Sequence, residues 1–228
     1  MIKNRIFALI FRIVAFTAIL FGIIYNTGVF QGDFHWIIFL YYTILSNIFA
    51  LALFGVLIFM TARKLKHNGA KGDSCFYPRI SAAVTVCIML TLIVFWCVLA
   101  PFAPAADRPF LVTYSNLAVH LIAPLLMLAD YIMFSVGGKL KRRDPFLFSI
   151  VPIAYLVITL IIGFSGAVVY QLPGFERAGS FPYFFLDYND VGLMMLVYIA
   201  ALIALYLAMG WVAWLADKKR GKRKNSPS

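Results

Sequence analysis

The sequence predicts an all-α membrane protein: a bundle of six transmembrane helices with both termini cytoplasmic. Of its 228 residues, 63% are hydrophobic, whereas the apolar share of a soluble domain is nearer half. The apolar residues also gather into six runs of about 20 residues, the length that an α-helix needs to cross a hydrocarbon core of about 30 Å. We place these spans at residues 6–25, 36–60, 80–100, 113–136, 146–170 and 191–215.

The basic residues predict the orientation of these spans. If the N-terminus is cytoplasmic, all but Arg108 and Arg177 of the 20 lysines and arginines fall on the cytoplasmic side, as positively charged loops do in membrane proteins. Residues 1–216 then form one membrane domain and residues 217–228 a basic cytoplasmic tail. A net charge of +11 is also typical of nucleic-acid binding, but this distribution argues against it. Membrane lipids are the expected partners.

The first two spans enter from opposite sides. Span 6–25 contains Arg12, which we expect to snorkel to the inner face. Span 36–60 begins at Trp36, part of an aromatic belt at the outer interface. Thr43 follows about seven residues later, or roughly 10 Å deeper at 1.5 Å per residue.

The fourth span carries the histidine that lies well inside an apolar run. His120 comes seven residues after Thr113, at the expected start of the span, and Pro124 predicts a kink just beyond it. Asp130 follows near the inner boundary, where a structural salt bridge, with Lys139 for example, or a headgroup contact is expected.

The remaining spans carry fewer polar groups. The small residues Gly163, Ser165 and Gly166 favour close helix–helix contact in the fifth span. The loop at 171–190 is long and aromatic, and we expect it to form either a partly interfacial lid over the bundle or a plain interfacial hairpin. We expect the sixth span to pack against the other helices and to contribute an aromatic belt at the inner interface. The three cysteines suggest neither a disulfide nor a metal site, and no metal or cofactor is predicted.

Thr43 and His120 form the candidate catalytic pair. Both helices enter from outside, so similar residue counts place the two side chains at similar depth. A threonine hydroxyl is a weak nucleophile until a general base takes its proton, and imidazole is well suited to that role near neutral pH. The pair requires that the second and fourth spans pack together.

Amides accompany both members of this pair. Asn47 lies one turn after Thr43, and Asn116 lies one turn before His120. Either could stabilise an oxyanion or orient the histidine. The other polar residues that could reach the same level are Ser46, Ser115, Asp187 and Asp190.

Three other interpretations stay open. Thr43 could bond to its own helix, and Ser46 and Asn47 could join neighbouring helices. His35 and His120 could bind one haem. The chain could also be a non-catalytic lipid-binding protein or a small-molecule transporter whose polar cavity contains Thr43 and His120.

The segments YYTILSNIF, NLAVHLIAPLLMLADY and FPYFFLDY resemble the pattern of bacterial six-span integral membrane proteins. These are distantly similar to the androgen-induced and androgen-dependent TFPI-regulating family. The resemblance implies a bacterial cytoplasmic (inner) membrane location. The eukaryotic family implies multi-pass threonine hydrolases that cleave fatty acid esters of hydroxy fatty acids. By position, the threonine nucleophile falls on Thr43 and the histidine on His120. Our hypothesis is therefore intramembrane hydrolysis of a lipid ester, whose identity the sequence leaves open.

Overall fold

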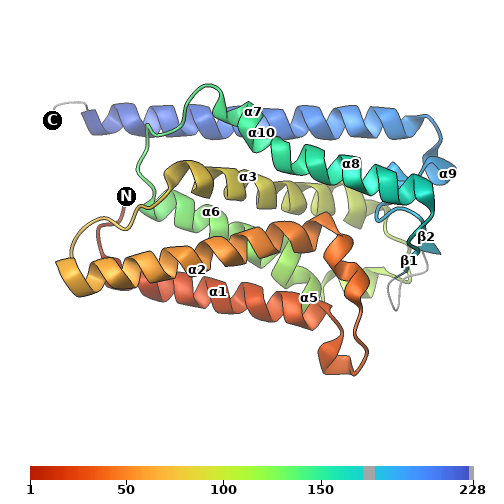
Figure 1. The fold of residues 1–228 in the computed structure, drawn as a ribbon, viewed down its shortest axis with the longest axis horizontal. Coiled ribbons are helices and arrows are strands. Elements are labelled where there is room, and N and C mark those ends of the chain that lie inside the picture. The colour runs from red at the N-terminus through yellow and green to blue at the C-terminus, as the bar shows by residue number, and fades with distance from the viewer. Residues whose placement is uncertain (172–177, 226–228) are drawn as a thin grey trace.

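The structure is a computed structural model that describes residues 1–171 and 178–225 (Figure 1). Six of the described helices are long and apolar enough to cross a membrane, which confirms an all-α membrane protein. The N-terminus and the C-terminal part of the last described helix lie toward the same end of the bundle (Figure 1). The spans are α1 (Arg5–Asn26), α2 (Tyr42–Asn68), Pro78–Phe102, Tyr114–Phe134, Asp144–Ser165 and Met194–Lys222.

Four helices form the core of the bundle. α1 packs along α2, α2 along α3 (Pro78–Val94), and α3 along α6 (Ala123–Phe134), while α6 also contacts α1. One apolar cluster contains buried side chains from all four helices. Outside this core lie α8 (Ile150–Ser165) and α10 (Met194–Asn225), the least buried of the described spans (Figure 1). Their exposed apolar side chains suit contact with lipid.

Short elements cover the end of the bundle opposite the termini. Two strands there pair in antiparallel fashion, with Tyr170 opposite Gly179. α7 (Asp144–Phe148) lies nearer the other end, where it packs against α10. The elements at the covered end are the 3₁₀ turns Val29–Gln31, Trp36–Leu40, Ala100–Phe102 and Phe184–Leu186, α4 (Arg108–Leu111), α5 (Tyr114–Leu117), β1 (Tyr170–Gln171), β2 (Ala178–Gly179) and α9 (Tyr188–Val191).

The second span begins later than the sequence suggested. Trp36–Leu40 forms a separate 3₁₀ turn, and Tyr41 has an extended backbone, so α2 starts at Tyr42. Thr43 therefore lies in the first turn of its helix, and the depth of about 10 Å along a continuous helix was wrong. The fifth span is also shorter than expected, because Gly166 ends it with φ 65°, a left-handed conformation that glycine adopts readily.

Arg12 does not snorkel; it is buried in the core of the bundle. Its Nε donates to Asp130 Oδ1 at 2.7 Å and its second terminal nitrogen to Asp130 Oδ2 at 3.3 Å. A further N–H donates to Thr61 Oγ1 at 2.6 Å. The expected salt bridge of Asp130 thus exists, but its partner is Arg12 of α1 and not Lys139.

Gly163, one of the small residues of the fifth span, serves a different contact from the one expected. Gly163 packs against the ring of Phe181, which belongs to the loop after β2, and a Cβ at this position would overlap that ring. Phe181 is buried and joins Phe185 and Leu186 in a cluster between α8 and α10. The glycine therefore makes room for the loop segment and not for a neighbouring helix.

Candidate active site

Two π-helical turns shape the interior near the covered end of the bundle. α3 continues into the turn Phe95–Leu99, and the fourth span contains the turn Ala118–Ile122. Pro101 follows the first turn and Pro124 the second, each two residues after its last residue. Proline lacks an N–H and crowds the carbonyl four residues earlier, and a wider turn relieves that conflict. The expected kink at Pro124 takes this form.

The two π turns bring an aromatic ring and an imidazole together. Phe95, from the first turn, stacks on His120, from the second, with ring centroids 3.7 Å apart and ring planes 23° apart. This contact fixes the plane of the imidazole against α3. Phe95 was not among the residues that the sequence singled out, because a phenylalanine in an apolar run gives no local signal.

His120 contacts Thr43, so the second and fourth spans pack together as the candidate pair requires. The Nε2 atom of His120 lies 3.2 Å from Thr43 Oγ1, and Nδ1 lies 3.0 Å from the main-chain carbonyl oxygen of Asn116. A carbonyl only accepts, so Nδ1 carries the hydrogen and Nε2 of the neutral ring is left as an acceptor. The threonine hydroxyl therefore donates to Nε2, the geometry that a general base needs.

Asn47 is part of the scaffold of this pair. Its side-chain nitrogen donates both hydrogens, to the carbonyl of Thr43 at 2.8 Å and to the carbonyl of Val119 at 3.1 Å. It thereby ties the first turn of α2 to the π turn beside His120. The expectation that Asn47 stabilises an oxyanion is not compatible with this arrangement, because both of its N–H groups are used.

Asn116 orients His120, but through its backbone. Its carbonyl oxygen accepts from Nδ1 of the imidazole, while its side-chain amide donates to the carbonyl of Leu111 at 3.1 Å. That bond uses one of the two amide hydrogens, and Asn116 also lines the cavity that Thr43 and His120 share. An oxyanion role for the second amide hydrogen stays a prediction.

The four additional polar residues divide into two groups. Ser46 bonds to Thr91 Oγ1 at 2.8 Å and to the carbonyl of Thr43, so it joins α2 to α3, whereas Ser115 lines the cavity. Asp187 caps α9 by accepting from the Asn189 N–H at 3.1 Å, and Asp190 is exposed on that helix. Neither carboxylate is among the described residues that line the cavity.

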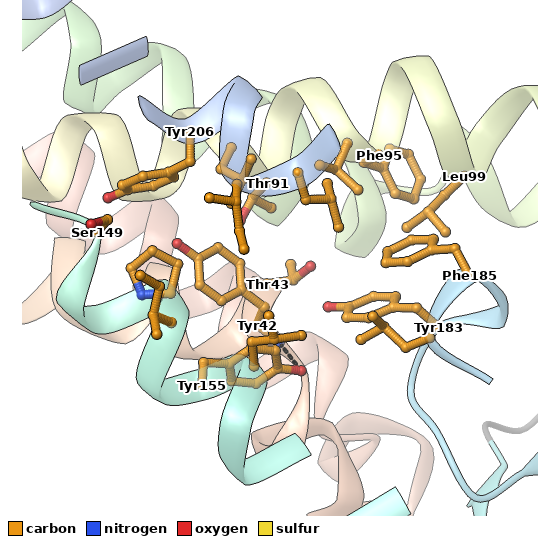
Figure 2. Close-up of a pocket in the computed structure, with 18 residues that line it drawn as sticks. Tyr42, Thr43, Thr91, Phe95, Leu99, Ser149, Tyr155, Tyr183, Phe185 and Tyr206 are labelled. Atoms are coloured by element: carbon orange, nitrogen blue, oxygen red, sulfur yellow. Dashed lines mark hydrogen bonds between the residues drawn. The ribbon is translucent and has the colours of Figure 1, made fainter. Parts of the chain in front are cut away.

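Thr43 lies where two hollows meet. A wide cavity of about 450 Å³ holds Thr43, His120 and Asn116 in its wall. A narrow apolar pocket of about 90 Å³ extends from Thr43 between α3, α8 and α10 (Figure 2). The residues that line both hollows are Thr43, Phe95, Leu99 and Tyr183.

Tyr183 is a site residue that sequence reasoning did not single out. Its hydroxyl points toward Thr43 from the segment that follows β2 (Figure 2). Desolvation raises the pKa of the Tyr183 phenol, so the group keeps its proton and can donate. Tyr183 belongs to the segment FPYFFLDY, but that segment marks an aromatic loop and not a particular hydroxyl.

The described residues do not favour a metal centre or the haem alternative. Among them, no group of three or more histidine, cysteine, aspartate or glutamate side chains could hold a metal ion. His35 lies in the turn before Trp36, where its Nε2 is 3.7 Å from Asp33. It is not among the described residues that line the cavity beside His120. The structure therefore does not bring His35 into the site.

Comparisons of the chain with family models, curated proteins and solved structures find no match. The resemblance to the bacterial six-span proteins and to the threonine hydrolases thus stays a prediction. A function for the site therefore rests on the contacts and the chemistry of the side chains around Thr43.

Proposed function

We propose that the protein is an intramembrane hydrolase of lipid esters, with Thr43 as nucleophile and His120 as general base. The observation that carries this proposal is the hydrogen bond between Thr43 Oγ1 and His120 Nε2, 3.2 Å long, at the junction of two hollows. A nucleophile and base within hydrogen-bond reach, with the base held by a third group, is the arrangement that activates a hydroxyl. Here the third group is the Asn116 carbonyl.

The proposed reaction proceeds through an acyl-enzyme. Thr43 Oγ1 attacks the ester carbonyl carbon as its proton passes to His120 Nε2, forming a tetrahedral oxyanion. That intermediate collapses as Nε2 returns the proton to the departing alcohol oxygen. Water then attacks the acyl-threonine with His120 again as base, and the fatty acid leaves while Thr43 regains its proton. The Asn116 carbonyl holds Nδ1–H throughout and stabilises the imidazolium.

The oxyanion needs a donor near Thr43, and Tyr183 is the best placed. Its hydroxyl points toward Thr43 (Figure 2), and the raised pKa of the phenol keeps the proton available. The second amide hydrogen of Asn116 is the other candidate. Loss of one such donor in an acyl-transfer site costs about 10²–10³ in rate, which makes Tyr183→Phe an informative variant.

The two hollows suit the two halves of a lipid ester. The narrow pocket is apolar, with aromatic rings and aliphatic side chains such as Leu90, Leu156 and Leu202 in its wall, and it suits the acyl chain. The wide cavity mixes aromatic rings with polar groups and suits the alcohol portion. An ester carbonyl at their junction would lie beside Thr43.

Hydrolysis of 4-nitrophenyl octanoate by purified protein, together with labelling by a fluorophosphonate probe, tests the proposal. We expect Thr43→Ala to abolish labelling and to lower hydrolysis at least about 10³-fold, and His120→Gln to lower it by about 10²–10⁴-fold. Thr91→Ala is the matched control, since Thr91 lines the same narrow pocket and bonds to Ser46. Peptide mass spectrometry should locate the phosphonate on Thr43.

Two outcomes would contradict the proposal. Hydrolysis that survives Thr43→Ala unchanged would show that the threonine is not the nucleophile. A folded wild-type protein that neither hydrolyses esters nor reacts with the probe, yet binds lipid, would favour the non-catalytic alternative. The wide cavity is the feature that such a lipid-binding or transport protein would use.

The orientation of the bundle belongs to the same proposal. Both termini face the cytoplasm of a bacterial cell, and the wide cavity lies toward the outer leaflet, as the distribution of lysine and arginine indicates. Alkaline phosphatase fused after the C-terminal tail should be inactive, and the same enzyme inserted into the loop at 103–107 should be active. Activity of the C-terminal fusion would show that the bundle has the opposite orientation in the membrane.

A further inference from the structure

Asp107 is a buried carboxylate in the wall of the wide cavity, and nothing in the sequence pointed to it. The residue is 4% exposed, and its Oδ1 makes no hydrogen bond within the described residues. It occupies the N-cap position of α4, where a carboxylate ordinarily accepts a backbone N–H. Its side chain makes no such capping bond.

Three other carboxylates of the spans are deeply buried, and each has partners: Asp217 accepts the Leu140 N–H at 2.8 Å, and the other two lie beside cations. Asp130 pairs with Arg12 at 2.7 Å, and Asp144 accepts from Arg79 Nε at 2.8 Å. Asp107 makes no ion pair among the described residues. A buried charge without a partner is costly, so a cation bound in the cavity would stabilise this carboxylate.

Aromatic rings line the same cavity as Asp107. Rings from five segments contribute, and the Tyr170 hydroxyl, like Asp107 Oδ1, is buried without a hydrogen-bond partner in the described structure. The rings of Tyr41 and Tyr170 meet edge to face, with centroids 5.6 Å apart. The cavity-lining aromatic residues at this end are Tyr41, Phe102, Phe110, Tyr170, Tyr183 and Phe184. A carboxylate and aromatic rings in the wall of one cavity are the groups that recognise alkylammonium ions.

We propose that the wide cavity binds an alkylammonium group, held by the Asp107 carboxylate and the surrounding aromatic rings. The group belongs to a lipid whose hydrocarbon part runs along the cavity toward Thr43. Because Asp107 Oδ1 is covered by its neighbours, binding requires the side chain to turn its carboxylate toward the ligand. This inference goes beyond hydrolysis, since binding of the cation needs no chemistry at Thr43.

Isothermal titration with octyltrimethylammonium, in an uncharged detergent, tests the site. The Thr43→Ala protein is the background, so that the result does not depend on catalysis. Octyl glucoside is the uncharged ligand, and tetramethylammonium separates a lipid-borne cation from a free one. Asp107→Asn removes the charge with little change of shape. Asp33→Asn is the matched control, because the Asp33 side chain is 75% exposed and does not line the cavity within the described residues.

We expect Asp107→Asn to weaken octyltrimethylammonium binding at least tenfold and to leave octyl glucoside binding unchanged, with a melting temperature no lower than that of the parent protein. Asp33→Asn should bind both ligands like the parent protein. Tighter binding of octyltrimethylammonium than of tetramethylammonium supports a lipid as the source. The proposal would be overturned if Asp107→Asn weakened the binding of both octyl ligands equally, or weakened the binding of neither. If the wild-type protein fails every esterase assay but octyltrimethylammonium still binds in an Asp107-dependent way, the hydrolysis proposal is refuted and the cation site is supported.

Discussion

Replacing Asp130 with asparagine should destabilise the bundle more than any change to a surface charge. Arg12 and Asp130 are each about 1% exposed, and two guanidinium nitrogens donate to the two carboxylate oxygens, at 2.7 and 3.3 Å. The third contact of Arg12, with Thr61 Oγ1, survives the substitution. Asparagine keeps the shape of the side chain but leaves the guanidinium charge buried without a counter-ion.

The size of the effect follows from that unpaired charge. Removing one member of a buried ion pair costs about 3–5 kcal/mol. By contrast, Lys64 and Asp73 form a pair whose side chains are 32% and 46% exposed, and such pairs contribute about 0.2–1 kcal/mol. Asp73→Asn is therefore the matched control for the same chemical change at an exposed position.

The assay is the free energy of unfolding in detergent, measured for the wild type and the two single variants. The double variant Arg12→Met/Asp130→Leu completes the set, since replacing both members of a buried pair by apolar residues is often neutral. We expect the double variant to recover most of the loss seen in Asp130→Asn. Equal stability of Asp130→Asn and Asp73→Asn, or a double variant as unstable as Asp130→Asn, would refute the reasoning.

Three further changes test other contacts. Gly163→Ala should cost about 1–3 kcal/mol of unfolding free energy, because the new methyl group overlaps the Phe181 ring. Pro124→Ala removes the cause of the π turn beside the site, so it should lower ester hydrolysis with little loss of melting temperature. The Lys64 hydrogen bond lowers the pKa of Asp73, so this pair stabilises the fold above the ordinary carboxylate pKa of about 4. Its contribution is lost at lower pH, where the melting temperatures of wild type and Asp73→Asn should converge.

Two of these tests have a control within the chain. Gly55→Ala is the counterpart of Gly163→Ala, because a Cβ at Gly55 would meet Phe16 at 3.6 Å, an ordinary contact. A Gly163→Ala protein as stable as Gly55→Ala would contradict the close packing of Phe181. Pro78→Ala, at the first turn of α3, controls for the general effect of removing a proline, because Pro78 lines neither hollow within the described residues. A constant difference between wild type and Asp73→Asn across pH 3–7 would show that the pair does not titrate as described.

The sequence alone determines the class of the protein and the approximate spans. Runs of about 20 apolar residues have one stable solution in a bilayer, a helix that satisfies its own backbone hydrogen bonds. This local rule gives all six helices. The rule misplaces the start of α2 at Tyr42, because the preceding 3₁₀ turn Trp36–Leu40 is as apolar as a helix. It also misplaces the end of α8, because the left-handed backbone of Gly166 ends the helix although the residues that follow are still apolar.

Only the tertiary structure decides which side chains meet. Arg12 could equally have reached the headgroups, but it lies 118 positions from Asp130 in sequence and bonds to it, because α1 packs beside α6. Thr43 and His120 could be matched in depth from the chain, yet their contact depends on the Asn47 bonds that join α2 to the second π turn. Hydropathy specifies where a segment lies along the membrane normal; the packing of helix against helix specifies its neighbours.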